Sequence, residues 1–176
     1  ASPKEFIATC ETTNDILGPF YREGAPERSN MLFEGVKGNV ITLKGKVIGG
    51  DCTRLINDAI IDVWHCDTEG NYDNDSDKYL HRAKAITGKD GSYSFTTIIP
   101  GKYLNGRLFR PSHIHFRVRA KHYKELISQV YFAGDPHIKK DPWASQKKAV
   151  HRILPVFPDD TQANLSVEFD IYMLES

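Results

Sequence analysis

The sequence lacks several features that would point to particular classes of protein. Acidic and basic residues are equally numerous, 23 of each, so the chain has no net charge with which to attract nucleic acid or an anionic membrane surface. It also lacks any apolar run of about 18 residues, the length that a membrane-spanning helix requires. A small molecule or another protein is therefore the expected partner, with no nucleic acid and no membrane span.

Cysteine is scarce as well. The three cysteines, Cys10, Cys52 and Cys66, cannot all pair with one another, and none has C-x-x-C spacing. Structural zinc held by thiolates is therefore not expected. The sequence leaves the compartment open: we expect a soluble protein, cytoplasmic or exported, because a start at Ala1 rather than Met is compatible with a removed signal.

Helical signals are few, whereas short β-rich runs separated by Gly, Pro, Asn and Asp recur throughout. Examples are "VITLKGKVIG", "AIIDVWHC", "SYSFTTI", "HIHFRVRA" and "LSVEFDIYML". This pattern is typical of a β-sandwich or barrel. We predict an all-β sandwich of mixed and antiparallel strands with long wrapping loops, formed by residues 1–176 as one domain. A short helix is expected from Asp141, a potential N-cap followed by Pro142.

One of these strands, in "RPSHIHFRVRA", carries two histidines two residues apart. Side chains at alternate positions share a face of a strand, so His113 and His115 lie opposite the apolar residues Ile114, Phe116 and Val118. Two imidazoles on one face can bind a single metal ion. They can also be two solvated residues on an edge strand, and the strand pattern alone leaves both interpretations open.

Four segments together resemble one family. They are "ILGPFYREGAP" (16–26), "DVWHCDTEGNYD" (62–73), "ITGKDGSYSFTTIIPGKY" (86–103) and "RPSHIHFRV" (110–118). In combination they resemble the intradiol ring-cleavage dioxygenases, non-haem Fe(III) enzymes. The resemblance implies that the chain cleaves a catechol-type ring between the two hydroxyl-bearing carbons with O2, inserting both oxygen atoms to give a cis,cis-muconate-type product.

The same resemblance implies a set of site residues. The matching positions are the iron ligands Tyr72, Tyr103, His113 and His115, the catalytic residues Arg110, Gln129 and Tyr103, and the substrate-binding residues Ile16, Pro19 and Arg110. The charges support this ligand set, because two phenolates and one hydroxide, with two neutral imidazoles, neutralise Fe(III). A neutral centre costs much less free energy to bury than a charged one. The ring substituents stay undetermined, although Lys102 or Arg107 could pair with a substrate carboxylate.

Two other functions compete with this interpretation. A metal-free binding module of the transthyretin or carboxypeptidase-regulatory type shares the pattern of residues 86–103, but has no reason to continue into R-P-x-H-x-H. A cupin-like zinc or Fe(II) site would want a glutamate soon after the second histidine, where the chain has Arg117 and Arg119. His65 is expected to be structural. With all four ligands on one chain, we expect a monomer or a homo-oligomer.

Overall fold

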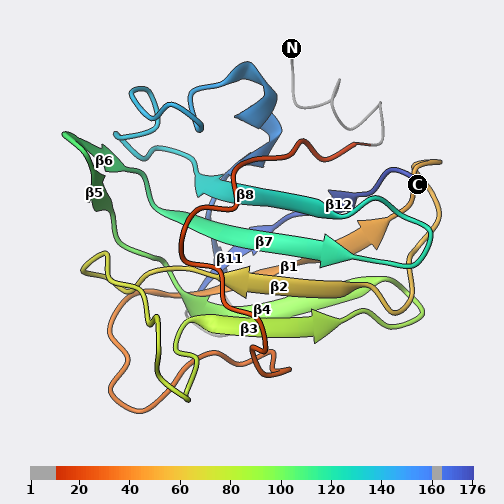
Figure 1. The fold of residues 1–176 in the computed structure, drawn as a ribbon, viewed down its shortest axis with the longest axis horizontal. Helices are drawn as coiled ribbons and strands as arrows, with labels where there is room; N and C mark the ends of the chain where they lie inside the picture. Colours follow the sequence, from red (N-terminus) through yellow and green to blue (C-terminus); the bar gives the residue numbers. More distant parts are fainter. Residues whose placement is uncertain (1–10, 160–163) are drawn as a thin grey trace.

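The computed structural model describes residues 11–159 and 164–176, in which two five-stranded sheets pack on each other (Figure 1). The first sheet contains β1 (Val40–Ile48), β4 (Ser92–Ile98), β10 (Phe157–Asp159), β11 (Asn164–Glu168) and β12 (Ile171–Tyr172). The second has the order β3 (Arg82–Ile86), β2 (Ile60–Trp64), β7 (His113–Arg119), β8 (Leu126–Phe132) and β9 (Ile153–Leu154). Most neighbours are antiparallel, but β1 pairs with β11 and β12, and β8 with β9, in parallel. The predicted all-β sandwich of mixed strands is confirmed.

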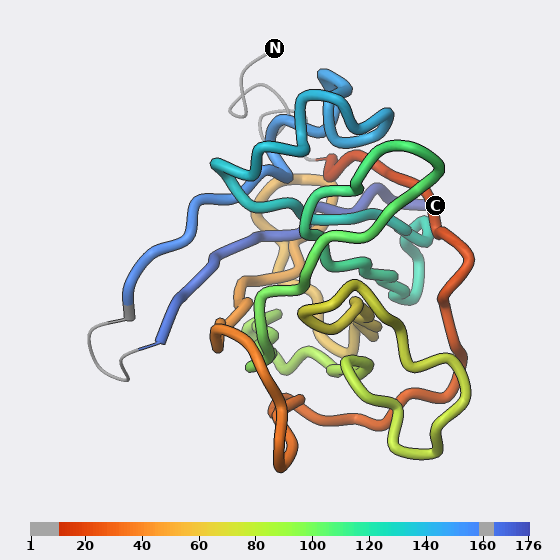
Figure 2. The backbone as a smooth tube through the Cα atoms, turned by 90° about the vertical axis from the view of Figure 1, so that its left-hand side faces the viewer, coloured from red at the N-terminus to blue at the C-terminus, as the bar shows by residue number. Residues whose placement is uncertain are grey.

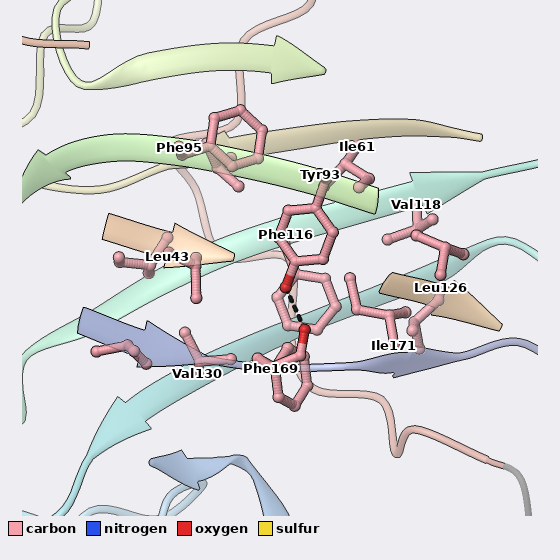
Figure 3. Packing of buried hydrophobic residues seen from close by; sticks show 14 of the residues in the cluster. Leu43, Ile61, Tyr93, Phe95, Phe116, Val118, Leu126, Val130, Phe169 and Ile171 are labelled. Carbon is pink, nitrogen blue, oxygen red and sulfur yellow. Dashed lines mark hydrogen bonds between the residues drawn. The ribbon is translucent and has the colours of Figure 1, made fainter. Parts of the chain in front are cut away.

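The core lies between the two sheets and is built by alternation along the strands (Figure 3). On β7, Ile114, Phe116 and Val118 are buried in this core, and Phe116 packs edge-on against Phe169. The opposite face of β7 is covered too, since His113 and His115 are each only 1% exposed. Because β7 also lies between β2 and β8, the interpretation of solvated histidines on an edge strand is wrong.

The chain before β1 provides that cover. It is bonded to β8 where the Asp15 amide donates to the Ile127 carbonyl, and to the edge strand β3 where Arg28 and Lys84 join the two segments through their backbones. In Figure 1 this red segment crosses in front of the second sheet. A separate hairpin of β5 (Tyr103–Asn105) and β6 (Leu108–Arg110) projects at one end of the sandwich (Figure 1). Viewed from that end, the loop over residues 65–81 lies close to the segment before β1 (Figure 2). Side chains from three distant parts of the sequence therefore meet at one end of β7.

The helix differs from the prediction. The described residues contain a 3-10 helix, η1 (Lys147–Arg152), which starts after Gln146 rather than at Asp141. Asp141 instead caps a turn, accepting the backbone N–H groups of Trp143 and Ala144 at 3.2 and 2.7 Å. Ser145 and Gln146 use their side chains to bond the carbonyls of residues 141 and 142, which competes with a regular helix. Within residues 11–159 and 164–176, no helix is long and apolar enough to cross a membrane.

Candidate metal centre

Four side-chain donor atoms converge at the start of β7. The Nε2 atom of His113 lies 3.2 Å from Nε2 of His115, 3.3 Å from the Tyr103 hydroxyl and 3.5 Å from the Tyr72 hydroxyl. Two donor atoms that each lie about 2.1 Å from a shared ion, at angles between square and tetrahedral, are about 3.0 to 3.4 Å apart. The spacing of these donors therefore fits one metal ion held by the four residues that the sequence indicated.

Each histidine ring is held by its surroundings. His115 stacks on Trp64, with ring centroids 5.1 Å apart and planes inclined by 5°. Gly18, with φ of +73°, lies against the Cε1 edge of the His115 ring, because a Cβ there would be 3.1 Å from His115 Cε1. His113 is oriented by a 2.7 Å hydrogen bond from Nδ1 to the Pro111 carbonyl. Since Nδ1 must carry the proton in that bond, Nε2 of His113 presents a lone pair to the other donors.

The protonation states suit a metal site. Burial lowers the pKa of His113 to about 4 and that of His115 well below the usual value, so both imidazoles are neutral near pH 7. Burial, reinforced by the neighbouring Tyr103, raises the pKa of Tyr72, and burial also raises the pKa of Tyr103. Both tyrosines therefore stay protonated until a cation of high charge lies beside them, which ionises a coordinated hydroxyl.

The set of available donors narrows the choice of metal. Within the part of the chain that the structure describes, no three residues among His, Cys, Asp and Glu gather in a way that could hold a metal ion. The third ligand of a cupin-like zinc or Fe(II) site is therefore missing there, and the hydroxyls of Tyr72 and Tyr103 are the donors nearest to the histidine pair. Phenolate oxygens with two imidazoles suit a hard, highly charged ion such as Fe(III).

Arg110 is the fixed cation of the site. It is 3% exposed, and it donates from Nε and Nη2 to the two carboxylate oxygens of Asp141 at 2.8 and 3.0 Å. Its guanidinium also lies over the Trp143 ring, 4.6 Å from the centroid. Burial alone would lower the pKa of Arg110, but the Asp141 bonds outweigh it and raise the pKa above its usual value. Arg110 pairs with Tyr103 across the β5–β6 hairpin, so its charge faces the phenol that it helps to ionise.

Gln129 is fully buried and lies opposite His115 in the β7–β8 pairing. Its Nε2 donates to the Ile16 carbonyl at 3.0 Å, which ties the chain before β1 to the site. Ile16 itself is half-buried, whereas Pro19 is exposed. The neighbour of Pro19, Phe20, is the residue that sequence reasoning missed.

Phe20 packs on both tyrosines. Its ring stacks on Tyr72 at a centroid distance of 4.1 Å and an angle of 15°, and meets Tyr103 edge-on at 6.1 Å. An aromatic residue in a segment rich in loop-forming residues gives no sign of its target, so only its place beside Pro19 in "GPFY" could have indicated it. The segment around Pro19 therefore forms one wall of the site through Gly18 and Phe20.

The hairpin of β5 (Tyr103–Asn105) and β6 (Leu108–Arg110) has two different faces. Directly paired residues share a face, so Asn105 and Leu108 lie on the side of Tyr103 and Arg110. Lys102 lies on the other side, with Nζ 4.5 Å above the ring of Phe109. Of the two cations considered for a substrate carboxylate, Lys102 therefore points away from the donors, and Arg107 is exposed at the turn.

His65 is not a ligand. Its Nδ1 lies 2.7 Å from the Cys66 carbonyl and its Nε2 lies 2.7 Å from the Thr97 hydroxyl, so both ring nitrogens have partners in the protein. Burial lowers the pKa of His65 to about 3, which keeps the ring neutral. The structural role expected for this residue agrees with these contacts.

Comparison with known proteins gives a consistent result. A protein family described as "Dioxygenase" has a model that matches residues 16–174. Among curated proteins, the chain is 34% identical over 169 residues to a chlorocatechol 1,2-dioxygenase of Rhodococcus opacus, covering 82% of this chain and 65% of that protein. It is 32% identical to catechol 1,2-dioxygenase 2 of Acinetobacter lwoffii, covering 74% and 54%. The chain thus spans less than two thirds of these relatives.

Solved structures share the fold. The dioxygenase domain of a dioxygenase and carbohydrate-binding protein fusion from Streptomyces sp. SirexAA-E superposes with a TM-score of 0.82 at 26% identity, covering 94% of this chain and 99% of that one. 3-Chlorocatechol 1,2-dioxygenase from Rhodococcus opacus 1CP gives a TM-score of 0.83 at 21% identity, covering 98% of this chain and 78% of that one. Both therefore share the overall fold of this chain.

Proposed function

The chain belongs to the intradiol ring-cleavage dioxygenase family, and from that premise we propose that it uses Fe(III) and O2 to cleave a catechol-type ring between its two hydroxyl-bearing carbons. The observation that carries the proposal is the convergence of two phenols and two neutral imidazoles on one point beside a buried arginine. The expected product is of the cis,cis-muconate type, with both oxygen atoms of O2 inserted. Small aromatic diols are the proposed substrates.

Tyr72, Tyr103, His113 and His115 would hold the metal. When bound, Fe(III) supplies Lewis-acid chemistry, drawing electron density from a catecholate so that a ring carbon becomes open to attack by O2. The four residues have unequal freedom. Tyr72 is clamped by the stacked ring of Phe20, whereas Tyr103 lies on a hairpin that pairs only with itself within the described sheets. Tyr103 would therefore be the ligand with more freedom to leave the metal when a catechol binds.

Displacement gives Tyr103 a catalytic role. Burial raises the pKa of Tyr103, so off the metal its oxygen would take one of the two protons that a catechol loses on binding. Arg110 keeps its charge at all relevant pH values and stabilises negative charge that develops on the ring. The Gln129 amide is the hydrogen-bonding side chain on the opposite strand, and Ile16 and Phe20 close the site from the side of the N-terminal segment.

Metal analysis with a visible spectrum tests the proposal directly. The purified protein is expected to contain about one iron per chain, because the four donors surround a single point, and to show a broad phenolate-to-Fe(III) absorption. Anaerobic catechol should shift that band, and O2 should then convert the catechol to a muconate. A colourless protein that takes up no iron and ignores catechol would instead support a metal-free binding sandwich.

Metal uptake should depend steeply on pH. Both tyrosines must lose a proton to bind, whereas the histidines, with the pKa of His113 at about 4, are already neutral. Release of the two phenol protons, with a third from the water that becomes the neutralising hydroxide, makes the apparent affinity rise with pH by about 1,000-fold per pH unit in the range where both phenols are protonated when metal-free. Competition with a chelator from pH 6 to 8, corrected for the chelator's own protonation, measures the slope. Tyr103→Phe should lower the slope by about one proton, and an unchanged slope in that variant would exclude Tyr103 as a ligand.

A further inference from the structure

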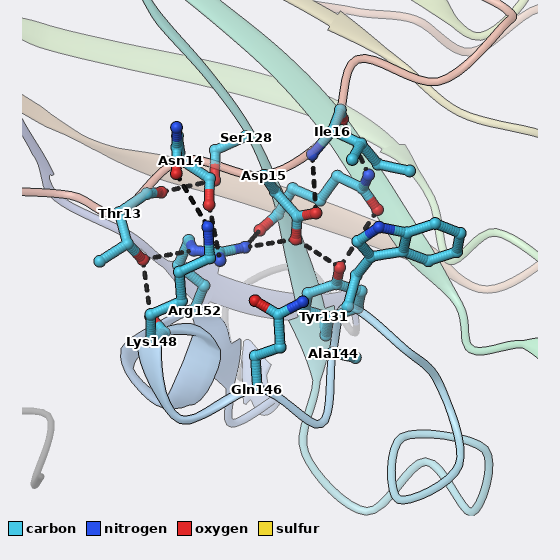
Figure 4. Close-up of polar contacts among 12 residues, drawn as sticks. Thr13, Asn14, Asp15, Ile16, Ser128, Tyr131, Ala144, Gln146, Lys148 and Arg152 are labelled. Atoms are coloured by element: carbon cyan, nitrogen blue, oxygen red, sulfur yellow. Dashed lines mark hydrogen bonds and ion pairs between the residues drawn. The ribbon is translucent and has the colours of Figure 1, made fainter.

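A second group of buried charges lies behind Arg110 and Gln129, and it contains no residue assigned so far (Figure 4). Asp15, Tyr131 and Arg152 are its centre. Arg152 and Tyr131 are fully buried, and the Asp15 side chain is 2% exposed. Burying an aspartate and an arginine is costly unless both are fully bonded, so these contacts need a structural or functional reason.

The Tyr131 hydroxyl is the point at which this group meets the proposed catalytic residues. It donates to Asp15 Oδ2 at 2.6 Å and accepts from Arg110 Nη2 at 3.4 Å. It also lies 3.3 Å from Oε1 of Gln129. Burial and the adjacent Asp15 raise the pKa of Tyr131, so the hydroxyl keeps its proton and can both donate and accept. One hydroxyl therefore contacts both Arg110 and Gln129.

Asp15 is in turn fixed by Arg152. Nη1 of Arg152 donates to Asp15 Oδ2 at 2.9 Å and to the Gln129 carbonyl at 2.7 Å. Nε of the same side chain donates to the Thr13 hydroxyl at 3.0 Å. The two buried cations Arg110 and Arg152 are thus balanced by Asp141 and Asp15, and the Tyr131 hydroxyl is the bridge between the two ion pairs.

We propose that Tyr131 is a positioning residue for ring cleavage: its hydroxyl, aimed by the Asp15–Arg152 ion pair, holds Arg110 and Gln129 in the orientation in which they act on the substrate. Asp141 holds both Nε and Nη2 of the Arg110 guanidinium, Trp143 covers one face, and Tyr131 adds a second contact at Nη2. Without that second contact Nη2 is held by Asp141 alone, so the guanidinium is fixed less firmly at that edge. The roles of Arg110 and Gln129 in this inference rest on the proposed function.

Tyr131→Phe removes the bridging hydroxyl and leaves both ion pairs intact. Because Tyr131 is not a metal ligand, iron content, the phenolate absorption and the dissociation constant of the anaerobic catechol complex should stay within about twofold of the unmodified protein, while kcat falls about 10- to 100-fold. A fall confined to kcat, with binding retained, is the signature of misplaced Arg110 and Gln129. A kcat within twofold of the unmodified protein would overturn the inference.

Tyr93→Phe is the matched control for a merely structural effect. Tyr93 is also a buried strand tyrosine whose hydroxyl donates one hydrogen bond, to the Phe169 carbonyl, but it lies in the core between the sheets (Figure 3). It should lose stability to a similar extent and keep its kcat. If Tyr93→Phe lowered kcat as much as Tyr131→Phe, the effect would be general loosening and the inference would be wrong.

A measurement on the iron-free protein separates this inference from the proposed function. The Nε–H proton of Arg110 is buried and bonded to Asp141, so its exchange with solvent, followed by NMR, should be slow. Tyr131→Phe should speed that exchange at least about tenfold, and Tyr93→Phe should leave it unchanged. Unchanged exchange in Tyr131→Phe would overturn the positioning role, even in an active enzyme. If the protein cleaves no catechol but Tyr131→Phe still speeds the exchange of the Arg110 Nε–H proton, the proposed function alone is refuted. The positioning of Arg110 by Tyr131 is then supported.

Discussion

Replacing His113 with alanine is expected to abolish iron binding. The other three donor atoms lie 3.2 to 3.5 Å from His113 Nε2. Loss of this nitrogen therefore removes the donor that is close to all the others. The variant should be purified without colour and should cleave no catechol. Added iron should raise the unfolding free energy of the unmodified protein by about 4 kcal/mol at a thousandfold excess over the dissociation constant, and that of the variant hardly at all.

The control for this variant is another histidine. His122 is exposed in the turn between β7 and β8 and has a φ of +72°, so His122→Asn keeps a residue that tolerates the left-handed backbone. It should bind iron as the unmodified protein does. Metal analysis and thermal unfolding with and without iron measure both variants. Full iron content in His113→Ala would show that the iron is bound elsewhere.

The pairing of the two histidines could be anticipated because it depends on local rules. Alternation along "HIHF" predicts that His113 and His115 share a face and that Phe116 enters the core, and both hold. The tyrosines could not be placed by such rules, since nothing in a strand pattern brings Tyr72 to residue 113. The resemblance of four segments to one family supplied that contact, and the structure shows it as a 3.5 Å approach.

What the sequence could not predict depends on contacts between distant segments. The burial of His115 requires Gly18, almost a hundred residues earlier, to cross the outer face of β7. The sequence predicts a helix cap at Asp141. In the structure its carboxylate accepts hydrogen bonds from Arg110 and caps only a turn. No local pattern distinguishes an aspartate that caps a helix from one that also neutralises a buried arginine. The wall formed by Phe20 and the bridge formed by Tyr131 are contacts of the same long-range kind.

Replacing Tyr103 with phenylalanine is expected to separate metal binding from catalysis. The variant keeps three of the four donors and the stacking of Phe20 on Tyr72, so it should retain part of the iron and a weaker phenolate absorption. It loses the oxygen that would take a substrate proton, and the loss of one general base lowers kcat by about 10²- to 10⁴-fold. Stopped-flow spectra of anaerobic catechol binding at several pH values measure the deprotonation step itself.

Tyr72→Phe is the matched comparison for Tyr103→Phe. Both tyrosines would offer the metal the same kind of phenolate oxygen, but they differ in how firmly their surroundings hold them. Tyr72 is held by Phe20 and by the charge of Arg82 above its ring, whereas Tyr103 lies on the β5–β6 hairpin, which pairs only with itself within the described sheets. A ligand that stays in place throughout should matter more for retaining iron, so Tyr72→Phe is expected to lose more metal than Tyr103→Phe. It should bind catechol with normal pH dependence in the fraction that keeps iron. If Tyr103→Phe bound catechol with unchanged kinetics, the proton would go elsewhere and Tyr103 would serve only to hold the metal.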